Sequence, residues 1–578
     1  MTEVKVTGIG VSEGVRIGKA FRYERAPAVQ FRQIDEQEAV SEVKRLTEAK
    51  EQAIKSIEEL SQQAKATIGE EKAGIIEAQK SFLQDPAFCP EMEKLIGKSL
   101  ISAEAAVDQV VKKFAAIFEA MPNEYMQERA ADVKDVGVRL LQALSGVQEK
   151  TLENIRSEVI LLADDLAPSD TIQLNKNYVL AFATQKGGKT SHTAIFAKTL
   201  GVPAVIGLGA FLEQVQEGDS IIVDGGAGIC ILRPAAETIK FYEEKQRQEM
   251  HDAEMLEHFA NEEAVTRDGY RVEIGANIGT AADAEFALEQ GAEGVGLLRT
   301  ELVFMAEERM PDEETQVTAY KSIVQSMGER PVIIRTLDIG GDKALSYLHI
   351  PQEMNPFLGY RAIRLCLDQK DLFVTQLRAI LRASAFGKVK IMFPMISCME
   401  EWRTARAVVE EVKQQLREEQ IAFDEAVEVG MMVEIPAAAI MAGQFAKEVD
   451  FFSIGTNDLV QYTLAVDRMN EKIDYLYDHF HPAVLQLLQH VAVAAKAEGK
   501  FVGMCGGMAG EPKAVPLLVA LGLDELSMSA TSIRKVKCAV SKLELAKCQE
   551  LLEEVMKMST AQDVRQKVEE FCKRHEIY

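Results

Sequence analysis

The 578-residue sequence has no long hydrophobic run, no C-x-x-C pair and no excess of basic residues. Its apolar stretches, such as residues 515–521, fall far short of the roughly 18 residues that a membrane-spanning helix needs. The opening MTEVKVTGIGV lacks the basic start and apolar core of a signal peptide, so we expect none. Eight widely scattered cysteines argue against a zinc site or a disulfide framework and favour a reducing cytoplasm.

Acidic residues outnumber basic ones, with 90 Asp and Glu against 65 Lys and Arg and a formal net charge of −25. Bulk electrostatics therefore exclude binding to nucleic acid or to an anionic membrane, although a basic partner could be attracted. Hydrophobic residues make up 47% and charged residues 27%, which is typical of a folded globular protein. The length predicts two to four domains.

The first 265 residues show three textures. Residues 1–33 and 146–233 mix short apolar runs with glycine turns, which predicts an α/β domain. Residues 34–145 are almost free of glycine and repeat apolar positions every three or four residues, which predicts a helical bundle inserted into that domain. Residues 234–265 contain no glycine and are heavily charged, and we expect a linker helix there.

Residues 266–578 alternate short apolar runs with helical segments. Eight such runs, among them RVEIGANI, PVIIRTLD and VGMMVEIP, predict a (β/α)₈ barrel, although a doubly wound open sheet would also alternate. Polar residues gather at the carboxyl ends of the runs, where the mouth of a barrel would lie. These residues are Arg299, Arg335, Asp338, Glu434, Asn457, Asp458 and Cys505.

The segment YVLAFATQKGGKTSHTAIFAK predicts a strand, a two-glycine turn and a helix that opens at Thr190 or Ser191. Gly187 and Gly188 would let the backbone approach an anion, and the helix N-terminus would face it. His192 lies in that first turn and could attack phosphorus with a neutral imidazole nitrogen. A helix-capping histidine without a chemical role is the alternative.

The same segment fails as a P-loop, because the required first glycine is replaced by Ala183.

GGKTSHTAIFAK resembles the phosphohistidine motif of enzyme I of the bacterial phosphoenolpyruvate:sugar phosphotransferase system and of the related dikinases and synthases. DFFSIGTNDLVQYTLAVDR, residues 450–468, resembles the second signature of the same group. The resemblance runs over essentially the whole chain. The inserted helical block and the absence of room for a large ATP-binding domain favour enzyme I over pyruvate phosphate dikinase or phosphoenolpyruvate synthase.

The resemblance implies a role for each matching residue. His192 would carry the phosphoryl group, with Thr171, Gly187, Gly188, Thr190 and Ser191 close to it. Phosphoenolpyruvate would bind the substrate residues Arg299, Arg335, Asn457, Asp458 and Arg468. Glu434 and Asp458 would ligate Mg²⁺, and Cys505 would protonate the enolate of pyruvate. Without the resemblance, a lone arginine is more often a surface ion-pair partner, and a lone cysteine is more often a small apolar filler. The two carboxylates could equally be buried partners of an arginine.

One position departs from the family pattern. After the strand that ends before Cys505 the family usually has Cys-Gly-Glu, whereas this chain has Cys505, Gly506 and, in the third place, Gly507. The missing carboxylate puts in doubt the tuning of Cys505 or of the nearby loop.

The resemblance also implies partners and an order of events. His192 would take the phosphoryl group from phosphoenolpyruvate, release pyruvate and pass the group to the carrier protein HPr, as the first step of sugar uptake in the cytoplasm. Residues 34–145 would dock HPr, and residues 266–578 would bind phosphoenolpyruvate and form a homodimer. The alternatives are a dikinase-like or synthase-like enzyme, which would need nucleotide, and a non-catalytic phosphoprotein that senses phosphoenolpyruvate.

Overall fold

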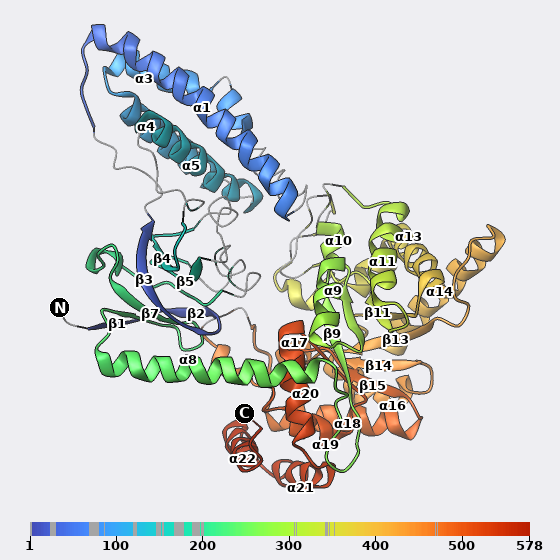
Figure 1. Cartoon of the computed structure of the whole chain (residues 1–578). Coiled ribbons are helices and arrows are strands. Elements are labelled where there is room, and N and C mark those ends of the chain that lie inside the picture. Colours follow the sequence, from blue (N-terminus) through green and yellow to red (C-terminus); the bar gives the residue numbers. More distant parts are fainter. Residues whose placement is uncertain are drawn as a thin grey trace. The chain divides into compact units, whose positions relative to one another are not determined.

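A computed structural model gives the fold (Figure 1), and it divides the chain into two compact units, Met1–Asp252 and Ala253–Tyr578. The described residues are 3–23, 31–68, 80–85, 87–119, 124–145, 152, 155–166, 178–187, 193, 197, 202–305, 307, 309–340, 345, 347–348, 350–351, 353–468, 470 and 472–577. Each unit is described by itself.

The first unit contains an eight-stranded sheet in the order β1-β8-β7-β3-β4-β5-β6-β2. Strands β3 to β6 run parallel to one another, and the remaining pairings are antiparallel. The strands are β1 (Val4–Thr7), β2 (Ile9–Ser12), β3 (Val15–Tyr23), β4 (Val159–Ala163), β5 (Val179–Thr184), β6 (Ala204–Ile206), β7 (Ser220–Asp224) and β8 (Ile229–Leu232).

Strands β4 and β6 are apolar and buried along their whole length, as expected of parallel strands that are covered on both faces. In β4, Leu161 and Ala163 pack into a core on one face of the sheet, whereas Ile160 and Leu162 pack into a core on the other. These runs are continuous rather than alternating, which agrees with the α/β prediction for this part of the sequence.

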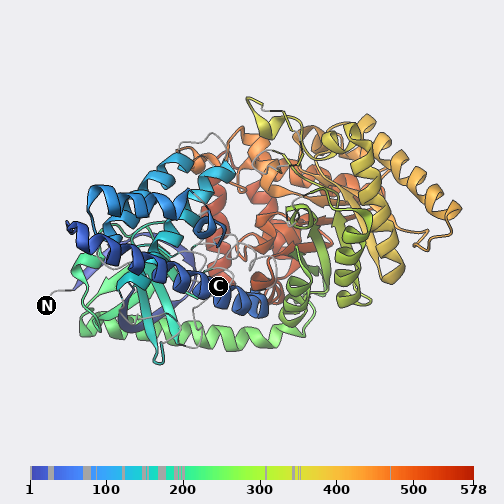
Figure 2. The ribbon, with the colours of Figure 1, turned by 90° about the horizontal axis from the view of Figure 1, so that it is seen from above.

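Most of the described residues between β3 and β4 are helical (Figure 1). It contains α1 (Glu36–Ile68), α3 (Phe88–Ser99), α4 (Ala103–Glu119) and α5 (Glu124–Ser145). Buried residues recur every three or four positions on each helix, so that apolar stripes meet in one core. On α1 the stripe is Leu46, Ala49, Ala53 and Ile57. The predicted helical bundle is present, and the view in Figure 2 shows its helices lying alongside one another.

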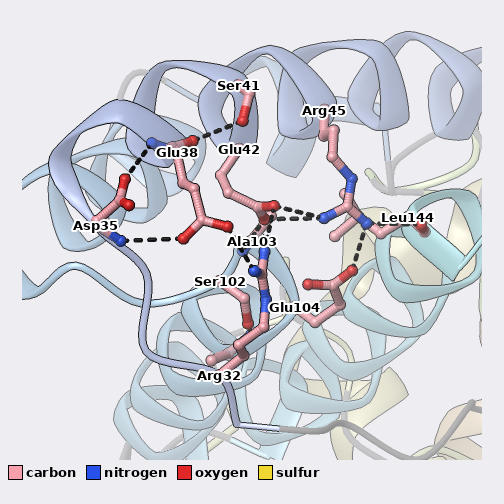
Figure 3. Close-up of polar contacts among 11 residues, drawn as sticks. Arg32, Asp35, Glu38, Ser41, Glu42, Arg45, Ser102, Ala103, Glu104 and Leu144 are labelled. Carbon is pink, nitrogen blue, oxygen red and sulfur yellow. Dashed lines mark hydrogen bonds and ion pairs between the residues drawn. The ribbon is translucent and has the colours of Figure 1, made fainter.

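A buried carboxylate joins the ends of these helices (Figure 3). Glu42 of α1 accepts the N–H of Ala103 at the start of α4 at 2.9 Å, and it also accepts hydrogen bonds from Arg32 and Arg45. Arg45 continues to Glu104 at 2.6 Å and to the carbonyl of Leu144 near the end of α5 at 3.1 Å. The cluster therefore fixes α1 to α4 and α5.

The charged segment expected as a linker forms helix α8 (Ala236–Glu257), followed by a 3₁₀ turn, η3 (His258–Ala260). Within the first unit, Tyr242 packs against Val15 in a small core, and Glu249 accepts the Val15 N–H at 2.9 Å. The first part of α8 is thus attached to the sheet of its own unit.

The second unit contains a closed barrel whose eight strands pair in parallel, in the order β10-β11-β12-β13-β14-β15-β16-β9. This confirms the (β/α)₈ prediction and excludes the open sheet. The strands are β9 (Glu273–Ile278), β10 (Gly294–Arg299), β11 (Val332–Arg335), β12 (Val389–Phe393), β13 (Glu428–Val433), β14 (Phe451–Ile454), β15 (Phe501–Met504) and β16 (Glu525–Met528).

Helices follow each strand and pack on the outside of the barrel, where they share one large apolar core with it. They are α9 (Ala281–Gln290), α10 (Glu301–Met305), α11 (Glu313–Met327), α12 (Ile363–Asp368), α13 (Lys370–Ala383), α14 (Met399–Glu418), α15 (Pro436–Ile440), α16 (Ala442–Phe445), α17 (Thr456–Leu464), α18 (Pro482–Ala497), α19 (Val515–Leu521), α20 (Ile533–Ser541), α21 (Leu545–Val555) and α22 (Ala561–Arg574).

The structure also bears on the cysteines and on membrane-spanning helices. All eight cysteines are free. Within the described part of the chain, no helix combines the length and the apolar character needed to span a membrane.

Candidate active site

The polar residues predicted at strand ends meet at one end of the barrel. Arg299 and Arg335 are the last residues of β10 and β11, and Glu434 and Cys505 directly follow β13 and β15. Asp458 lies in the first turn of α17, just after β14. Because the carboxyl ends of parallel strands form the same mouth, the structure brings these five side chains together.

Arg335 is buried between two carboxylates. Its Nη2 donates to Glu301 Oε1 at 2.5 Å, and its Nη1 lies 3.1 Å from Asp338 Oδ2. Burial opposes the charged guanidinium, but Glu301 and Asp338 outweigh it and raise the pKa of Arg335. The side chain is therefore a fixed, fully charged cation at the mouth.

A second buried arginine, Arg361, was missed by the sequence reasoning. Its Nη2 donates to Asp338 Oδ1 at 2.8 Å and lies 3.9 Å from Asp458 Oδ2, and its Nη1 donates to Tyr462 at 3.2 Å. Arg361 comes from the long segment between β11 and α12 rather than from a strand end. The length of that segment was the available signal, because long loops at a barrel mouth commonly carry functional residues.

Arg299 differs from both, because its side chain is exposed and takes part in no ion pair among the described residues. Packing around the guanidinium and the neighbouring charge of Arg335 lower its pKa. An arginine pKa normally lies above 12, so Arg299 still carries its charge near neutral pH. It is a cation at the mouth that is available to an anionic ligand.

Glu434 and Asp458 form a buried acidic pair whose charge is incompletely balanced. Glu434 is 1% exposed and accepts the Met395 N–H at 2.6 Å. Burial, together with Asp458 and Asp338, raises the pKa of Glu434 to about 8. Asp458 Oδ1 lies 3.5 Å from Arg468 Nη1 but has no hydrogen-bond partner among the described residues.

This donor set fits Mg²⁺, which takes few protein oxygens and completes its shell with substrate phosphate and water. Over the described residues, no group of three or more His, Cys, Asp or Glu side chains could hold a metal ion. A cation at Glu434 and Asp458 would therefore rely on ligand oxygens for most of its coordination.

Asn457 is held by two neighbouring loops. Its Oδ1 accepts the Gly507 N–H at 2.9 Å, and its carbonyl accepts the hydroxyl of Tyr477 at 3.1 Å. Among the described residues Nδ2 of Asn457 donates no hydrogen bond, so its N–H₂ can donate toward a ligand. A Cβ at Gly507 would lie 3.1 Å from Oδ1, so the residue that departs from the family pattern contacts Asn457 through its backbone.

Cys505 is a buried thiol at the end of β15. Burial, with smaller contributions from Glu434 and Glu525, raises its pKa to about 11, and the Ser453 hydroxyl and Arg335 oppose that rise. Its carbonyl accepts Asn277 Nδ2 at 2.9 Å, and its N–H donates to Ile454 at 3.0 Å. A thiol with this pKa is protonated at neutral pH and can donate a proton.

Three family descriptions match the chain, and they follow one another along it. "PEP-utilising enzyme, N-terminal" matches residues 7–129, "PEP-utilising enzyme, mobile domain" residues 155–228, and "PEP-utilising enzyme, PEP-binding domain" residues 253–545. A phosphoenolpyruvate-protein phosphotransferase of Geobacillus stearothermophilus is 50% identical over 564 residues, 97% of each chain. That of Bacillus subtilis is 47% identical over 565 residues, 98% of each chain.

The chain belongs to the PEP-utilising enzyme family. An NMR solution structure of Enzyme I (nEIt) is 39% identical, covers 42% of this PEP-utilising enzyme and 99% of its own chain, and has a TM-score of 0.37. The three family descriptions and the two phosphotransferase relatives confirm, at the level of the family, the resemblance found in the sequence.

The residues around the predicted phosphohistidine lie mostly outside the described part of this PEP-utilising enzyme. Those outside it are Thr171, Gly188, Thr190, Ser191 and His192. Gly187 is described and has φ of +113°, a backbone conformation that favours glycine. Thr193, the next residue after His192, is buried and donates through Oγ1 to the carbonyl of Leu166, just after β4, at 3.1 Å.

Proposed function

We propose that this PEP-utilising enzyme transfers the phosphoryl group of phosphoenolpyruvate to His192 and then to a histidine of the carrier protein HPr, releasing pyruvate. The observation that carries the proposal is the convergence at one barrel mouth of a free cation, an unbalanced acidic pair and a protonated thiol. The relatives named phosphoenolpyruvate-protein phosphotransferase, which match 97% or more of the chain, support the same activity.

The substrate carries a carboxylate and a phosphate on three carbons, so its pocket needs several cations. Arg299 and Arg468 would bind its anionic groups from the rim of the mouth, and Arg335 from the buried floor. The free amide N–H₂ of Asn457 would donate to the phosphoryl group. Planar guanidinium forks suit such oxyanions because they can donate two parallel hydrogen bonds.

Glu434 and Asp458 would hold Mg²⁺, which when bound neutralises charge on the phosphoryl oxygens. The acidic pair itself supports this assignment, because a bound cation would balance the two buried carboxylates. The pKa of Glu434, raised to about 8, would fall once that charge is present.

The transfer itself would require little covalent help from the barrel. An imidazole nitrogen of His192 forms the new N–P bond while the P–O bond to the enol breaks, and the electron pair stays on the enolate. Cys505 then gives its proton to the enolate carbon, which yields pyruvate and leaves a thiolate. Arg335 would stabilise that thiolate, since its charge lowers the pKa of Cys505.

Other parts of the proposal concern partners and place. We propose that residues 34–145 dock HPr and that residues 266–578 form a homodimer. We also propose that the reaction takes place in the cytoplasm as the first step of sugar uptake. The residues 1–33 and 146–233 would carry His192 between the two reaction partners, with 234–265 as the linker. Such a relay needs domain motion because one histidine serves two sites.

The test is incubation of the whole chain with radiolabelled phosphoenolpyruvate and Mg²⁺, without nucleotide, followed by tryptic peptide mapping. We expect an acid-labile, alkali-stable label on the peptide that contains His192, and none in His192→Ala. His251→Ala, a histidine of α8, is the matched control and should label normally. Label that appears only when nucleotide is added would favour a dikinase or synthase, and no label on this peptide would contradict the mechanism.

A further inference from the structure

Two buried polar atoms inside the barrel have no hydrogen-bond partner among the described residues. They are Oγ of Ser453 on β14 and Oε2 of Glu525 on β16. Buried polar groups in folded proteins are nearly always paired, so an unpaired hydroxyl and an unpaired carboxyl in one lumen call for an explanation. Neither group has a role in the phosphoryl transfer proposed above.

The Glu525 carboxyl occupies space that three glycines leave free. A Cβ at Gly275 or Gly296 would lie 2.4 or 2.5 Å from Oε1, and a Cβ at Gly503 would lie 2.7 Å from Oε2. These glycines come from β9, β10 and β15. Any side chain at those positions would displace the carboxyl, so the barrel interior is shaped around it.

The Gly503 contact places Glu525 next to the strand that carries the thiol. Gly503 is the register partner of Ser453, and Cys505, two residues after Gly503 and directly after the end of β15, continues the face of the strand that points into the barrel. Phe451, which shares that face with Ser453, packs with Cys505 in the core inside the barrel. Gly503 is also the register partner of Glu525, so Ser453 and Glu525 lie at one level on the two strands that flank β15, and Cys505 lies two residues closer to the mouth.

Ser453 and Cys505 already influence each other. The approach of the Ser453 hydroxyl falls short of a hydrogen bond to the resting thiol, yet it lowers the pKa of Cys505 against the larger effect of burial. Arg335 acts in the same direction, whereas Glu434 and Glu525 oppose it. A hydroxyl in this position can donate to a thiolate once one forms.

Glu525 is suited to supply a proton. Burial and the neighbouring Glu273 raise its pKa to about 8, with Lys390 opposing and Glu293 adding to the rise. The carboxyl is therefore largely protonated at neutral pH. Glu273 and Lys390 lie at the amino-terminal ends of β9 and β12, and both side chains are partly exposed, so solvent reaches this end of the lumen.

We propose that Glu525 and Ser453 form a proton relay through the barrel that reprotonates Cys505 after each turnover. The relay rests on the proposed function, in which Cys505 gives its proton to the enolate. The thiolate takes the hydroxyl proton of Ser453, and Ser453 takes the carboxyl proton of Glu525, with a bridging water where the atoms are too far apart. Glu525 is left as a carboxylate and regains its proton from solvent water, so protons and charge balance.

The test measures pyruvate release from phosphoenolpyruvate in the presence of Mg²⁺ and excess HPr, using rapid quench and steady-state assays on the whole chain. The variants are Glu525→Gln and Ser453→Ala. Each should give a first-turnover burst of one pyruvate per site at the normal rate, because the resting thiol is protonated. The steady state should then be slower by roughly ten- to a hundred-fold.

The pH profile separates a relay from a structural role. In the unmodified chain the steady-state rate should fall as pH rises through about 8, where Glu525 loses its proton, and Glu525→Gln should lose this dependence. Ser384→Ala, a buried serine of the same unit outside the lumen, is the matched control and should show neither burst nor slowing.

Two results would overturn the relay. One is a steady-state rate within about two-fold of the unmodified chain in both variants, and the other is an equal slowing of the first turnover and the steady state. Failure of the proposed function has a different signature, because the unmodified chain would then release no pyruvate and both proposals would fall together.

Discussion

Two buried glutamates, one in each unit, differ in how many hydrogen-bond donors surround their carboxyl groups. Glu42 in the helical block is 3% exposed, and its carboxylate accepts the Ala103 N–H and the guanidinium groups of Arg32 and Arg45. Glu434 at the barrel mouth is 1% exposed, and Met395 N–H is its single hydrogen-bond donor in the described part of the chain.

The electrostatics follow the difference in partners. Burial disfavours the ionised form of Glu42, but its three donors outweigh burial and lower its pKa. For Glu434, burial and two nearby carboxylates raise the pKa to about 8. A buried charge that is fully paired stabilises the fold, whereas one that is left short of partners marks a place where a ligand supplies the missing charge.

The largest expected effect follows from the unpaired glutamate. Glu434→Gln should slow pyruvate release by roughly 10³-fold, because the transition state loses several kcal/mol of charge stabilisation. The thermal unfolding temperature should be unchanged or slightly raised, since a buried ionisable group is replaced by a neutral one. A coupled pyruvate assay and circular dichroism measure the two quantities.

Glu425 has an exposed carboxyl just before β13, and Glu425→Gln is the matched control. It should change neither the rate of pyruvate release nor the thermal unfolding temperature. A loss of stability in Glu434→Gln without a loss of rate would reverse the assignment of the two glutamates.

Much of the second unit was predictable from sequence because its signals are local. Each barrel strand is a short apolar run, and Arg299, Arg335 and Cys505 stand where such a run ends. Parallel pairing then places them together without further information. The same logic reaches Glu434 and Asp458, which follow neighbouring strands.

What could not be predicted depends on contacts between distant segments. Arg361 enters the mouth from a loop, and Glu525 occupies a slot made by glycines of three other strands. A charged residue at the start of the apolar run ELSMSA was the visible signal for Glu525, but its partners are set by barrel closure. Glu42 is similar, because it looks like any polar residue on a helical face until Ala103 and Arg32 are placed beside it.

The second expected effect is on stability. Glu42→Ala should lower the free energy of unfolding of the helical block by about 3 kcal/mol, because it leaves an N–H and two guanidinium groups without their shared partner. Hydrogen exchange of peptides from α1 and α4 in the whole chain measures this loss. Glu48→Ala, an exposed position on the same helix, should leave exchange unchanged. Equal exchange in both variants would contradict a stabilising role for the Glu42 cluster.

A third, smaller effect is that the two units should respond to pH in opposite directions. Glu42 has a lowered pKa, so its stabilisation is complete above its unfolded pKa and is lost as pH falls through the folded one. The raised pKa of Glu525 reverses the sign: its contribution is complete below the ordinary value of 4.5 and is lost as pH rises toward about 8. Hydrogen exchange measured from below pH 4.5 to about pH 8 should show the helical block losing stability as pH falls and the barrel losing stability as pH rises.

Glu42→Gln should flatten the trend of the helical block, and Glu525→Gln that of the barrel. Parallel trends in the two units would mean that other groups dominate and that these two carboxyls do not distinguish them.

The smallest expected effect concerns how much Arg32, compared with the other donors to Glu42, contributes to the stability of the helical block. The Arg32 side chain is half exposed, whereas Glu42 is almost fully buried, so water screens their ion pair and can replace the guanidinium when it is removed. Arg32→Met should therefore shift the exchange of α1 far less than Glu42→Ala does, because Glu42 keeps Arg45 and the Ala103 N–H. If Arg32→Met changed the exchange of α1 as much as Glu42→Ala does, Arg45 and the Ala103 N–H would not be enough to keep Glu42 paired, and all three donors would be needed.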